Sequence, residues 1–205
     1  YISPSSGDDS NDGSQAAPLK TIAAAPNENS EIYLKRGDVF YGPITKFKNC
    51  KISAYGEGPM PVISGFKIVK NPDAWERQPN DIWRIDLTKP ENFDGYFAEG
   101  KANNIGAVYD MASDKLYGHL VCRYNQLNAY GDFWVSGDVN RVNVQDKKEN
   151  FRYLYFRSKG NPSAGGAKIA FSTYGTGVTN LENCEVDSIA VTGFGVHGVA
   201  RAWNI

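Results

Sequence analysis

The sequence predicts an all-β solenoid, in which short strands wind into coils that stack on one another. Short apolar strands alternate with corners rich in Gly, Asp, Asn and Pro, and the strands that contain Ile32 and Ile52 lie 20 positions apart. A solenoid coil buries its inward side chains only against neighbouring coils, so a repeat of this length requires stacking. The 21 Gly, 12 Tyr and 10 Phe residues also favour strands and turns.

The composition is that of a folded chain, and it excludes several classes of partner. Hydrophobic residues make up 41% and charged residues 22%, which is ordinary for a packed domain. The 22 basic and 23 acidic residues nearly cancel, and no basic run is present that would attract nucleic acid or anionic lipid. No apolar run reaches the roughly 18 residues of a membrane span. We therefore expect no nucleic-acid partner and no membrane insertion.

The chain begins with turn-forming residues and a short helix candidate. Residues 3–14 are almost wholly Ser, Gly, Asp and Asn, and the Ala-rich segment 16–25 has Pro18 near its first turn. The Asp8–Gly13 loop resembles a calcium loop, but the twelfth position is Leu19, which cannot ligate a metal. We interpret this loop as a capping turn and assign no metal site.

Strands then follow in three blocks. Residues 1–69 are predicted to form an N-terminal cap and the first coils, with strands at 31–34, 39–41, 50–54 and 62–63. Residues 70–162 break the rhythm and are predicted to form an antiparallel, aromatic-rich insertion with strands at 82–87, 131–136 and 152–157. Residues 163–205 resume the coils, with strands at 167–171, 181–186, 189–191 and 193–199. The stretch 101–126 has no clear assignment.

The last residues are apolar and end in mid-rhythm, whereas a solenoid needs a polar cap at its end. We therefore expect a β-helix that is incomplete at its C-terminus, completed by a further chain segment or by self-association. The three cysteines, Cys50, Cys122 and Cys184, lack metal-ligand spacing and predict no disulfide framework. Buried packing thiols are the interpretation that we favour.

Several segments resemble a known family. The opening Tyr1–Pro4, the following Gly7–Ser14 and Ala17–Ile22, and the coil segments 34–42, 52–59 and 62–65 are similar to those of secreted bacterial proteins of the pectate-lyase-like superfamily. The Trp83-Arg84 strand and the segment 154–162 resemble an insertion in such chains. The resemblance implies one continuous domain with a right-handed parallel β-helix, in a secreted protein whose signal peptide has been removed. It does not specify activity, because the superfamily includes lyases, hydrolases, epimerases and non-catalytic adhesins.

Chemistry on uronate or neutral polysaccharide needs distinct side chains. A lyase needs a Lys or Arg base together with Ca²⁺ or another cation, and a hydrolase needs two carboxyl groups. The final coil offers the best catalytic candidates, which are Glu185, Asp187, His197 and Arg201. His197 is flanked by glycines that would let a sugar approach the backbone. The simpler interpretation, which we favour, is that His197 and Asp187 are solvated corner residues.

The aromatic insertion suggests a binding role. Indole and phenol faces stack on sugar rings, so four side chains are candidates for a glycan groove, namely Trp75, Trp83, Tyr96 and Trp134. We favour the alternative that these rings form a small aromatic core.

Two functional hypotheses follow. The first is the N-terminal part of an extracellular carbohydrate-active enzyme, a polysaccharide lyase or glycoside hydrolase, with catalytic coils largely beyond residue 205. Ca²⁺ is expected only if it is a lyase. The second is a non-catalytic cell-surface or fibre protein that binds glycans or self-assembles. An array of acids and bases on one face of consecutive coils would favour the enzyme.

Overall fold

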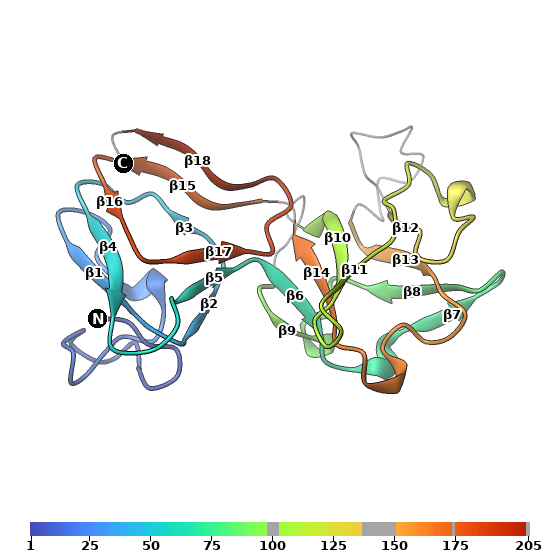
Figure 1. Ribbon diagram of the computed structural model, residues 1–205, viewed down its shortest axis with the longest axis horizontal. Coiled ribbons are helices and arrows are strands. Elements are labelled where there is room, and N and C mark those ends of the chain that lie inside the picture. The colour runs from blue at the N-terminus through green and yellow to red at the C-terminus, as the bar shows by residue number, and fades with distance from the viewer. Residues whose placement is uncertain (98–102, 137–150, 174, 204–205) are drawn as a thin grey trace. The chain divides into compact units, whose positions relative to one another are not determined.

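The computed structural model describes residues 1–97, 103–136, 151–173 and 175–203 (Figure 1). The chain forms two compact units, which we call the solenoid unit (Tyr1–Gly65 with Thr176–Ile205) and the sandwich unit (Phe66–Gly175). Strands dominate both units, and the helical segments among the described residues are short 3₁₀ turns. None of these turns is long and apolar enough to cross a membrane.

The solenoid unit contains three coils of three strands each. The first coil holds β1 (Glu31–Lys35), β2 (Val39–Tyr41) and β3 (Ile44–Thr45). The second holds β4 (Lys51–Tyr55), β5 (Val62–Ser64) and β15 (Thr176–Glu182), and the third holds β16 (Glu185–Val186), β17 (Ala190–Thr192) and β18 (His197–Trp203). Corresponding strands pair in parallel to give three sheets, β1-β4-β16, β2-β5-β17 and β3-β15-β18. This unit is therefore β-helix-like, which confirms the predicted stacking of parallel strands.

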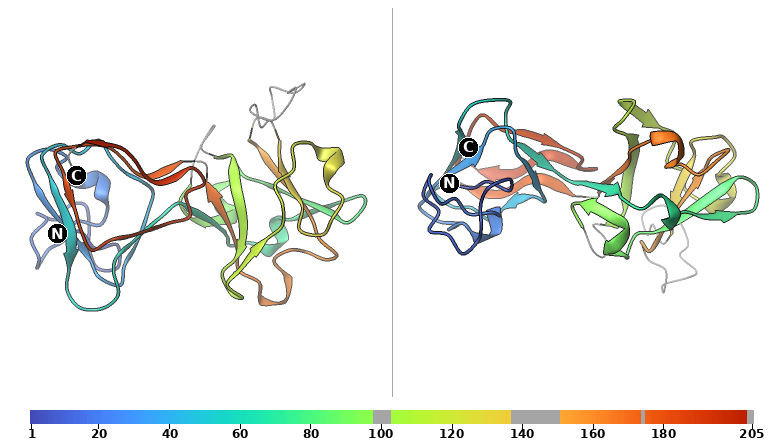
Figure 2. Two further views of the ribbon diagram at one scale, coloured as in Figure 1. Left: turned by 45° about the horizontal axis from the view of Figure 1, so that its top comes forward. Right: turned by 90° about the horizontal axis from the view of Figure 1, so that it is seen from below.

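Successive coils of the solenoid unit stack on one another (Figure 2). Their apolar residues share one interior. Ile32 pairs with Ile52 in register, and both side chains are almost wholly buried. Ile189 of the third coil packs against the same cluster. The roughly 20-residue recurrence in the sequence thus reflects side chains that bury one another from coil to coil.

Three asparagines stack at the corner before the first sheet. Asn29, Asn49 and Asn183 adopt left-handed backbone angles, with φ of 50°, 51° and 50°. Asn49 Nδ2 donates to Asn29 Oδ1 at 3.0 Å, and Asn183 Nδ2 donates to Asn49 Oδ1 at 3.3 Å. Asparagine tolerates this conformation better than most residues, and each amide supplies both a donor and an acceptor. Sequence analysis missed this ladder, although each Asn is followed three residues later by Ile or Val.

The predicted N-terminal helix is wrong. Only η1 (Ile22–Ala24), a single 3₁₀ turn, forms in the segment 16–25. Leu19 bridges to Ile2 in parallel, and the Asp9 carboxylate accepts the N–H groups of Lys20 and Thr21 at 2.9 and 2.8 Å. These bonds hold the backbone extended before η1, and the remaining Ala run is shorter than the roughly 12 residues that an isolated α-helix needs.

The sandwich unit interrupts the second coil, because the chain leaves after β5 and returns at β15. One antiparallel sheet has the order β11-β10-β14-β6-β9, and the other has the order β12-β13-β8-β7. The strands of the first are β6 (Phe66–Val69), β9 (Phe93–Gly95), β10 (Ile105–Asp110), β11 (Lys115–Tyr117) and β14 (Ile169–Thr173). Those of the second are β7 (Glu76–Gln78), β8 (Ile82–Asp86), β12 (Phe133–Val135) and β13 (Tyr153–Arg157). The 3₁₀ turns among the described residues of this unit are η2 (Pro72–Ala74), η3 (Pro90–Asn92), η5 (Tyr124–Gln126) and η7 (Ala164–Gly166).

Both sheets contribute to one hydrophobic core. Val108 and Phe171 come from the five-stranded sheet, and Leu154 and Phe156 come from the four-stranded sheet. The inward positions of β13 alternate with outward ones, as they must in a strand with one buried face. The second face of the four-stranded sheet is thus left for other contacts.

The assignment of residues 167–171 to the resumed coils was wrong. β14 pairs antiparallel with β10 and β6, so this strand belongs to the sandwich unit. A short apolar strand bounded by glycines fits either architecture, and periodicity alone cannot tell them apart. The unassigned stretch supplies β10 and β11. The aromatic-rich insertion is antiparallel, as predicted. The prediction that the β-helix is incomplete at its C-terminus concerns residues outside those that the structure describes.

Candidate functional site

The outward face of the four-stranded sheet carries a row of aromatic and charged side chains. Trp134 of β12 lies opposite Tyr155 of β13, which lies opposite Arg84 of β8. Arg84 in turn lies opposite Glu76 of β7. The neighbouring positions Phe133 and Phe156 point into the core. Strand alternation therefore places this row on the face opposite the core.

Three rings on this face touch one another. Tyr124, from η5, packs edge-on against Tyr155 and Trp134, with ring centroids 5.1 and 6.0 Å apart. Trp134 and Tyr155 have centroids 5.5 Å apart. Tyr124 is 41% exposed, and the other two rings are half-buried. We call Tyr124, Trp134 and Tyr155 the aromatic platform.

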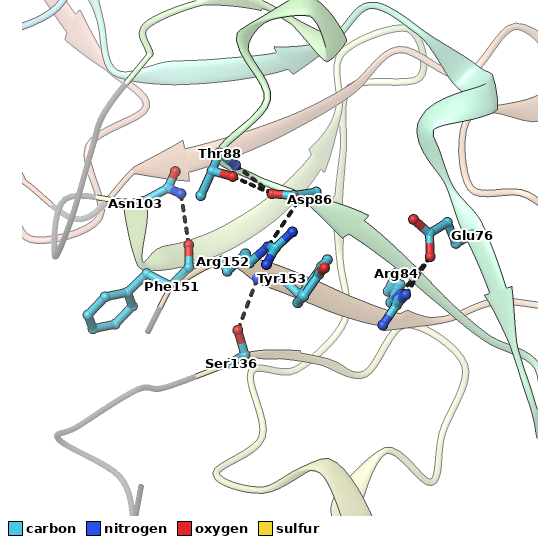
Figure 3. Close-up of polar contacts among 9 residues, drawn as sticks. All are labelled: Glu76, Arg84, Asp86, Thr88, Asn103, Ser136, Phe151, Arg152 and Tyr153. Atoms are coloured by element: carbon cyan, nitrogen blue, oxygen red, sulfur yellow. Dashed lines mark hydrogen bonds and ion pairs between the residues drawn. The ribbon is translucent and has the colours of Figure 1, made fainter. Parts of the chain in front are cut away.

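Two arginine–carboxylate pairs lie on the same four-stranded sheet (Figure 3). Arg84 donates through Nε and Nη2 to Glu76 Oε2, at 2.8 and 2.7 Å. Arg152 Nε lies 3.1 Å from Asp86 Oδ2. The ring of Tyr153 lies 4.7 Å from the Arg84 guanidinium and 4.8 Å from that of Arg152. The cations are therefore held by both a carboxylate and an aromatic face.

These contacts change the acidity of the groups involved. The hydrogen bond to Glu76 raises the pKa of Arg84 above its ordinary value and outweighs the effect of burial. Burial acts to raise the pKa of Asp86, but hydrogen bonds from Thr88 and Arg152 together outweigh it and lower the pKa. Arg84 and Asp86 consequently stay charged near neutral pH.

A pocket of about 720 Å³ adjoins the platform. Tyr124 belongs to the platform and also lines the pocket. Arg77 and Asp81 lie 3.8 Å apart in an ion pair, and the Tyr130 hydroxyl donates to Asp81 at 3.0 Å. The lining residues are Arg77, Gln78, Pro79, Asn80, Asp81, Ile82, Tyr124, Asn125, Leu127, Asn128 and Arg157.

The four aromatic candidates from the sequence lie in different surroundings. Trp75 is only 4% exposed in the core, where its Nε1 donates to Ser163 Oγ at 2.9 Å. Trp83 packs partly buried against the same core and donates to the Ser158 carbonyl at 3.1 Å. Tyr96 is half-buried, and burial raises its pKa. Only Trp134 joins the platform, so the structure does not bring the four together in one groove.

Sequence analysis missed Tyr124 and Tyr155. The alternation Tyr153-Leu154-Tyr155-Phe156 was a signal for Tyr155, because a strand with one buried face must present every second ring outward. Tyr124 lies in a turn, and its place over the sheet depends on the path of the loop.

A second surface lies on the solenoid unit. Glu31, Lys51 and Glu185 occupy one register position on β1, β4 and β16, and we call them the charged row. Lys51 Nζ lies 3.3 Å from Glu185 Oε1, and the Tyr33 hydroxyl donates to Glu31 Oε2 at 2.6 Å. The hydrogen bond to Glu31 raises the pKa of Tyr33. The row borders a hollow of about 660 Å³ that the three stacked asparagines also line.

The catalytic candidates of the third coil are distributed over two sheets. Glu185 lies on β16, and Asp187 follows it, exposed, accepting a hydrogen bond from Ser188 Oγ at 2.9 Å. His197 is exposed at the start of β18, which belongs to another sheet. Arg201 also lies in β18, but its side chain is outside the described part of the structure. Glu185 and Asp187 therefore lie two positions apart at the first sheet, whereas His197 lies on another sheet.

The remaining acidic residues and cysteines offer no site for a metal ion in the described part of the chain. Among the described residues, no group of three or more His, Cys, Asp or Glu side chains could hold a metal ion. Asp8 and Asp12 accept N–H groups of Ser10 and Ser14, both at 2.9 Å, so these carboxylates cap turns. Cys50 and Cys184 are buried free thiols, while Cys122 is exposed.

No protein-family model and no curated protein matches this chain. Among solved structures, the complex of XylC with xylose superposes with a TM-score of 0.55 and 14% identity over 93% of this chain. The likeness is one of fold. This chain spans only 34% of the XylC chain.

Two further solved structures are similar over smaller or less well superposed regions. The GH136 lacto-N-biosidase from Eubacterium ramulus is 30% identical over 34% of this chain and 14% of its own, with a TM-score of 0.28. A chain described as a glycoside hydrolase is 12% identical over 94% of this chain and 50% of its own, with a TM-score of 0.47.

Proposed function

We propose that this chain is part of a secreted, carbohydrate-active, right-handed β-helix protein whose aromatic platform binds polysaccharide. The observation that carries the proposal is the set of three touching rings on an outward sheet face, beside two arginine–carboxylate pairs. Large aromatic groups on a surface are costly to expose, and clusters of them mark binding sites. The fold likeness to XylC, whose complex contains xylose, supports a sugar ligand.

The chemistry of the face suits a sugar. The C–H groups of a pyranose or furanose ring can pack on Tyr124, Trp134 and Tyr155, because an aromatic face is apolar and electron-rich. Sugar hydroxyls can then donate to Glu76 and accept from Arg84, which are already held in position by their mutual bond. Groups that are ordered before binding lose less entropy when the ligand arrives.

The charged row supports a second candidate, in which the solenoid unit contributes to catalysis. Glu31, Lys51 and Glu185 place acids and a base on one face of consecutive coils, which is the arrangement that favours an enzyme over a fibre protein. Asp187 N donates to the Ile52 carbonyl at 3.0 Å, which adds one hydrogen bond to β4 just beyond the end of β16. The Cα atoms of residues two apart in an extended chain lie roughly 6.6 Å from one another. The flexible side chains of Glu185 and Asp187 can therefore bring their carboxyl groups to the roughly 6.5–9.5 Å separation that inverting hydrolysis uses.

An activity panel separates the enzyme from the non-catalytic alternative. The chain is incubated with neutral and uronate polysaccharides, and reducing ends and unsaturated products are followed with and without calcium chelation. Reducing ends alone support hydrolysis, and chelator-sensitive unsaturated products support a lyase. Loss of activity in Glu185→Gln, with the fold intact by circular dichroism, would assign the reaction to the charged row. The absence of both products would leave a glycan-binding or fibre role.

The platform is tested by binding. Trp134→Ala should weaken the affinity for a bound polysaccharide at least tenfold, about 1.4 kcal/mol, because one stacking surface is removed. Leu116→Ala is the matched control, since Leu116 is a 63% exposed apolar residue on the other sheet of the same unit. Isothermal titration or affinity electrophoresis measures the change. Equal affinity in the Trp134 and Leu116 variants would reject the platform as the binding surface.

A further inference from the structure

We infer that the pocket beside the platform is a subsite for an acidic sugar, and that Arg157 binds the carboxylate or sulfate group of that sugar. This inference rests on the proposed function, because it takes the platform to hold a neighbouring unit of the same polysaccharide chain. Tyr124 joins the two places, since its ring lies 5.1 Å from that of Tyr155 and the residue also lines the pocket. A polysaccharide on the platform thus comes within reach of the pocket.

Strand alternation places Arg157 on the face that carries the platform. Arg157 follows Tyr155 by two positions in β13, so both side chains leave the strand on the same side, opposite to Phe156 in the core. Nη1 of Arg157 donates to the Leu127 carbonyl at 2.7 Å, and both residues line the pocket. The guanidinium itself therefore lies at the wall of the pocket, next to the platform.

The pocket carries more positive than negative charge. Its charged lining residues are Arg77, Asp81 and Arg157, so two guanidinium groups accompany one carboxylate. Asp81 already has two partners, because it lies 3.8 Å from Arg77 and accepts from the Tyr130 hydroxyl at 3.0 Å. Lys159 is a further cation nearby, 5.3 Å from the Tyr130 ring, over which Arg157 also lies. An anion that enters the pocket therefore encounters a net positive charge.

Within the described residues, no carboxylate pairs with Arg157. Asp132 is adjacent, because the Arg157 N–H donates to its carbonyl at 2.9 Å. The Asp132 carboxylate instead accepts the N–H groups of Asn128 and Ala129, at 3.0 and 2.7 Å. Arg157 thus differs from Arg77, whose charge is balanced by Asp81.

The unused edge of the Arg157 guanidinium has the geometry of an oxyanion site. With Nη1 on the Leu127 carbonyl, the remaining donors are on Nε and Nη2, which form a fork that can bind two oxygens of one anion. Nε is buried and has no acceptor among the described residues. A carboxylate or sulfate can place one oxygen on Nη2 and, as the side chain adjusts, a second on Nε. A single hydroxyl group offers only one oxygen, so it satisfies this edge less well.

The experiment uses the full 205-residue chain. Isothermal titration compares oligogalacturonates with their methyl esters, which keep the sugar backbone and remove the charge. Sulfated and unsulfated galacto-oligosaccharides form a second pair, so the two pairs distinguish a carboxylate from a sulfate ligand. Arg157→Gln removes the proposed cation. Lys89→Gln is the matched control, because it removes the same charge at an exposed position of the same unit that does not line the pocket.

Asp81→Asn is a second variant that should gain affinity, which misfolding cannot imitate. Asp81 has a left-handed backbone, with φ of 58°, which asparagine also tolerates. The substitution removes the only carboxylate among the described lining residues. It should tighten the binding of an acidic ligand about threefold and leave a neutral ligand unchanged. If Arg157→Gln does not fold, an unchanged affinity for acidic ligands in Asp81→Asn overturns the subsite.

The inference predicts that the acidic member of at least one pair binds roughly tenfold more tightly than its neutral partner, through a charge-assisted contact. Arg157→Gln should abolish this preference and leave neutral binding within about twofold, and Lys89→Gln should keep the preference. Equal binding within both pairs, or a preference that survives Arg157→Gln, would overturn the subsite. Weaker binding in Trp134→Ala would then still support the proposed function, whereas no binding of any sugar would reject the proposed function and the subsite with it.

Discussion

At the level of single residues, the carboxylates of the N-terminal loop stabilise the fold through hydrogen bonds within turns. Asp9 accepts two backbone N–H groups and the Thr21 hydroxyl, and thereby fastens the opening loop to the segment that enters the first coil. The loop resembles a calcium loop in sequence, and its hydrogen bonds are those of capping turns. The amino-acid sequence alone supported the capping interpretation, because Leu19 stands where a calcium loop needs an acid.

These carboxylates predict a dependence of stability on pH. The backbone hydrogen bond from Thr21 lowers the pKa of Asp9, and hydrogen bonds from Ser10 and Ser14 lower those of Asp8 and Asp12. A folded-state pKa below the unfolded value of about 3.9 gives stability that is present above that value and lost as pH falls through the folded pKa. The melting temperature should therefore fall below about pH 4.

A matched pair of variants tests the assignment. Asp9→Asn should lower the melting temperature at pH 7 and flatten its fall in acid, because the carboxylate that titrates has gone. Glu57→Gln, an exposed position, should retain the full acid sensitivity. Thermal melts by circular dichroism from pH 7 to pH 2.5 measure both. An acid profile that is the same in Asp9→Asn and in the unaltered chain would show that Asp9 is not responsible.

Among the elements, the stacked asparagines Asn29, Asn49 and Asn183 (the asparagine ladder) hold successive coils in register. Asn49 is its middle rung, and it combines a left-handed backbone with bonds to the asparagines on both sides. Asn49→Ala should lower the free energy of unfolding by about 2–3 kcal/mol, from the cost of a left-handed residue and the lost hydrogen bonds.

Asn49→Gly separates these two contributions, because glycine accepts the backbone angle but lacks the amide. It should retain part of the stability that the alanine variant loses. Urea unfolding followed by fluorescence gives the free energies. If both variants match the unaltered chain, the ladder has no part in stability.

The elements also show what the sequence could and could not predict. The sequence predicted the strands around Ile32 and Ile52 correctly. Their 20-residue spacing is the length of one coil, and it recurs because each coil buries its apolar side chains against the next. β14 was placed in the wrong unit, because five apolar or small residues, Ile169–Thr173, read alike in a coil and in a sandwich. Of the platform, only Trp134 was named, since a loop residue such as Tyr124 has no periodicity to reveal it.

In the whole molecule, two separate cores predict two cooperative units. One core surrounds Ile52 and Ile63, and the other surrounds Leu154 and Phe171. Leu154→Ala should cost about 2–5 kcal/mol through the cavity that it leaves in the sandwich core. Hydrogen exchange should then lose more protection in β8 and β13 than in β4. An equal loss in all three strands would show that the chain unfolds as one unit.

The place at which the sandwich interrupts the solenoid has a consequence for the order of assembly. β15 lies between β3 and β18, yet it is synthesised only after the whole segment Phe66–Gly175. Joining the ends of a flexible segment of about 110 residues costs about 3 kcal/mol more than joining the ends of a five-residue loop. Early folding of the sandwich unit would bring the two ends of this segment closer together and reduce the cost. Because β15 must pair with β3, the coils cannot form in strict order from the N-terminus. The third sheet can form only after the chain has returned from the sandwich unit.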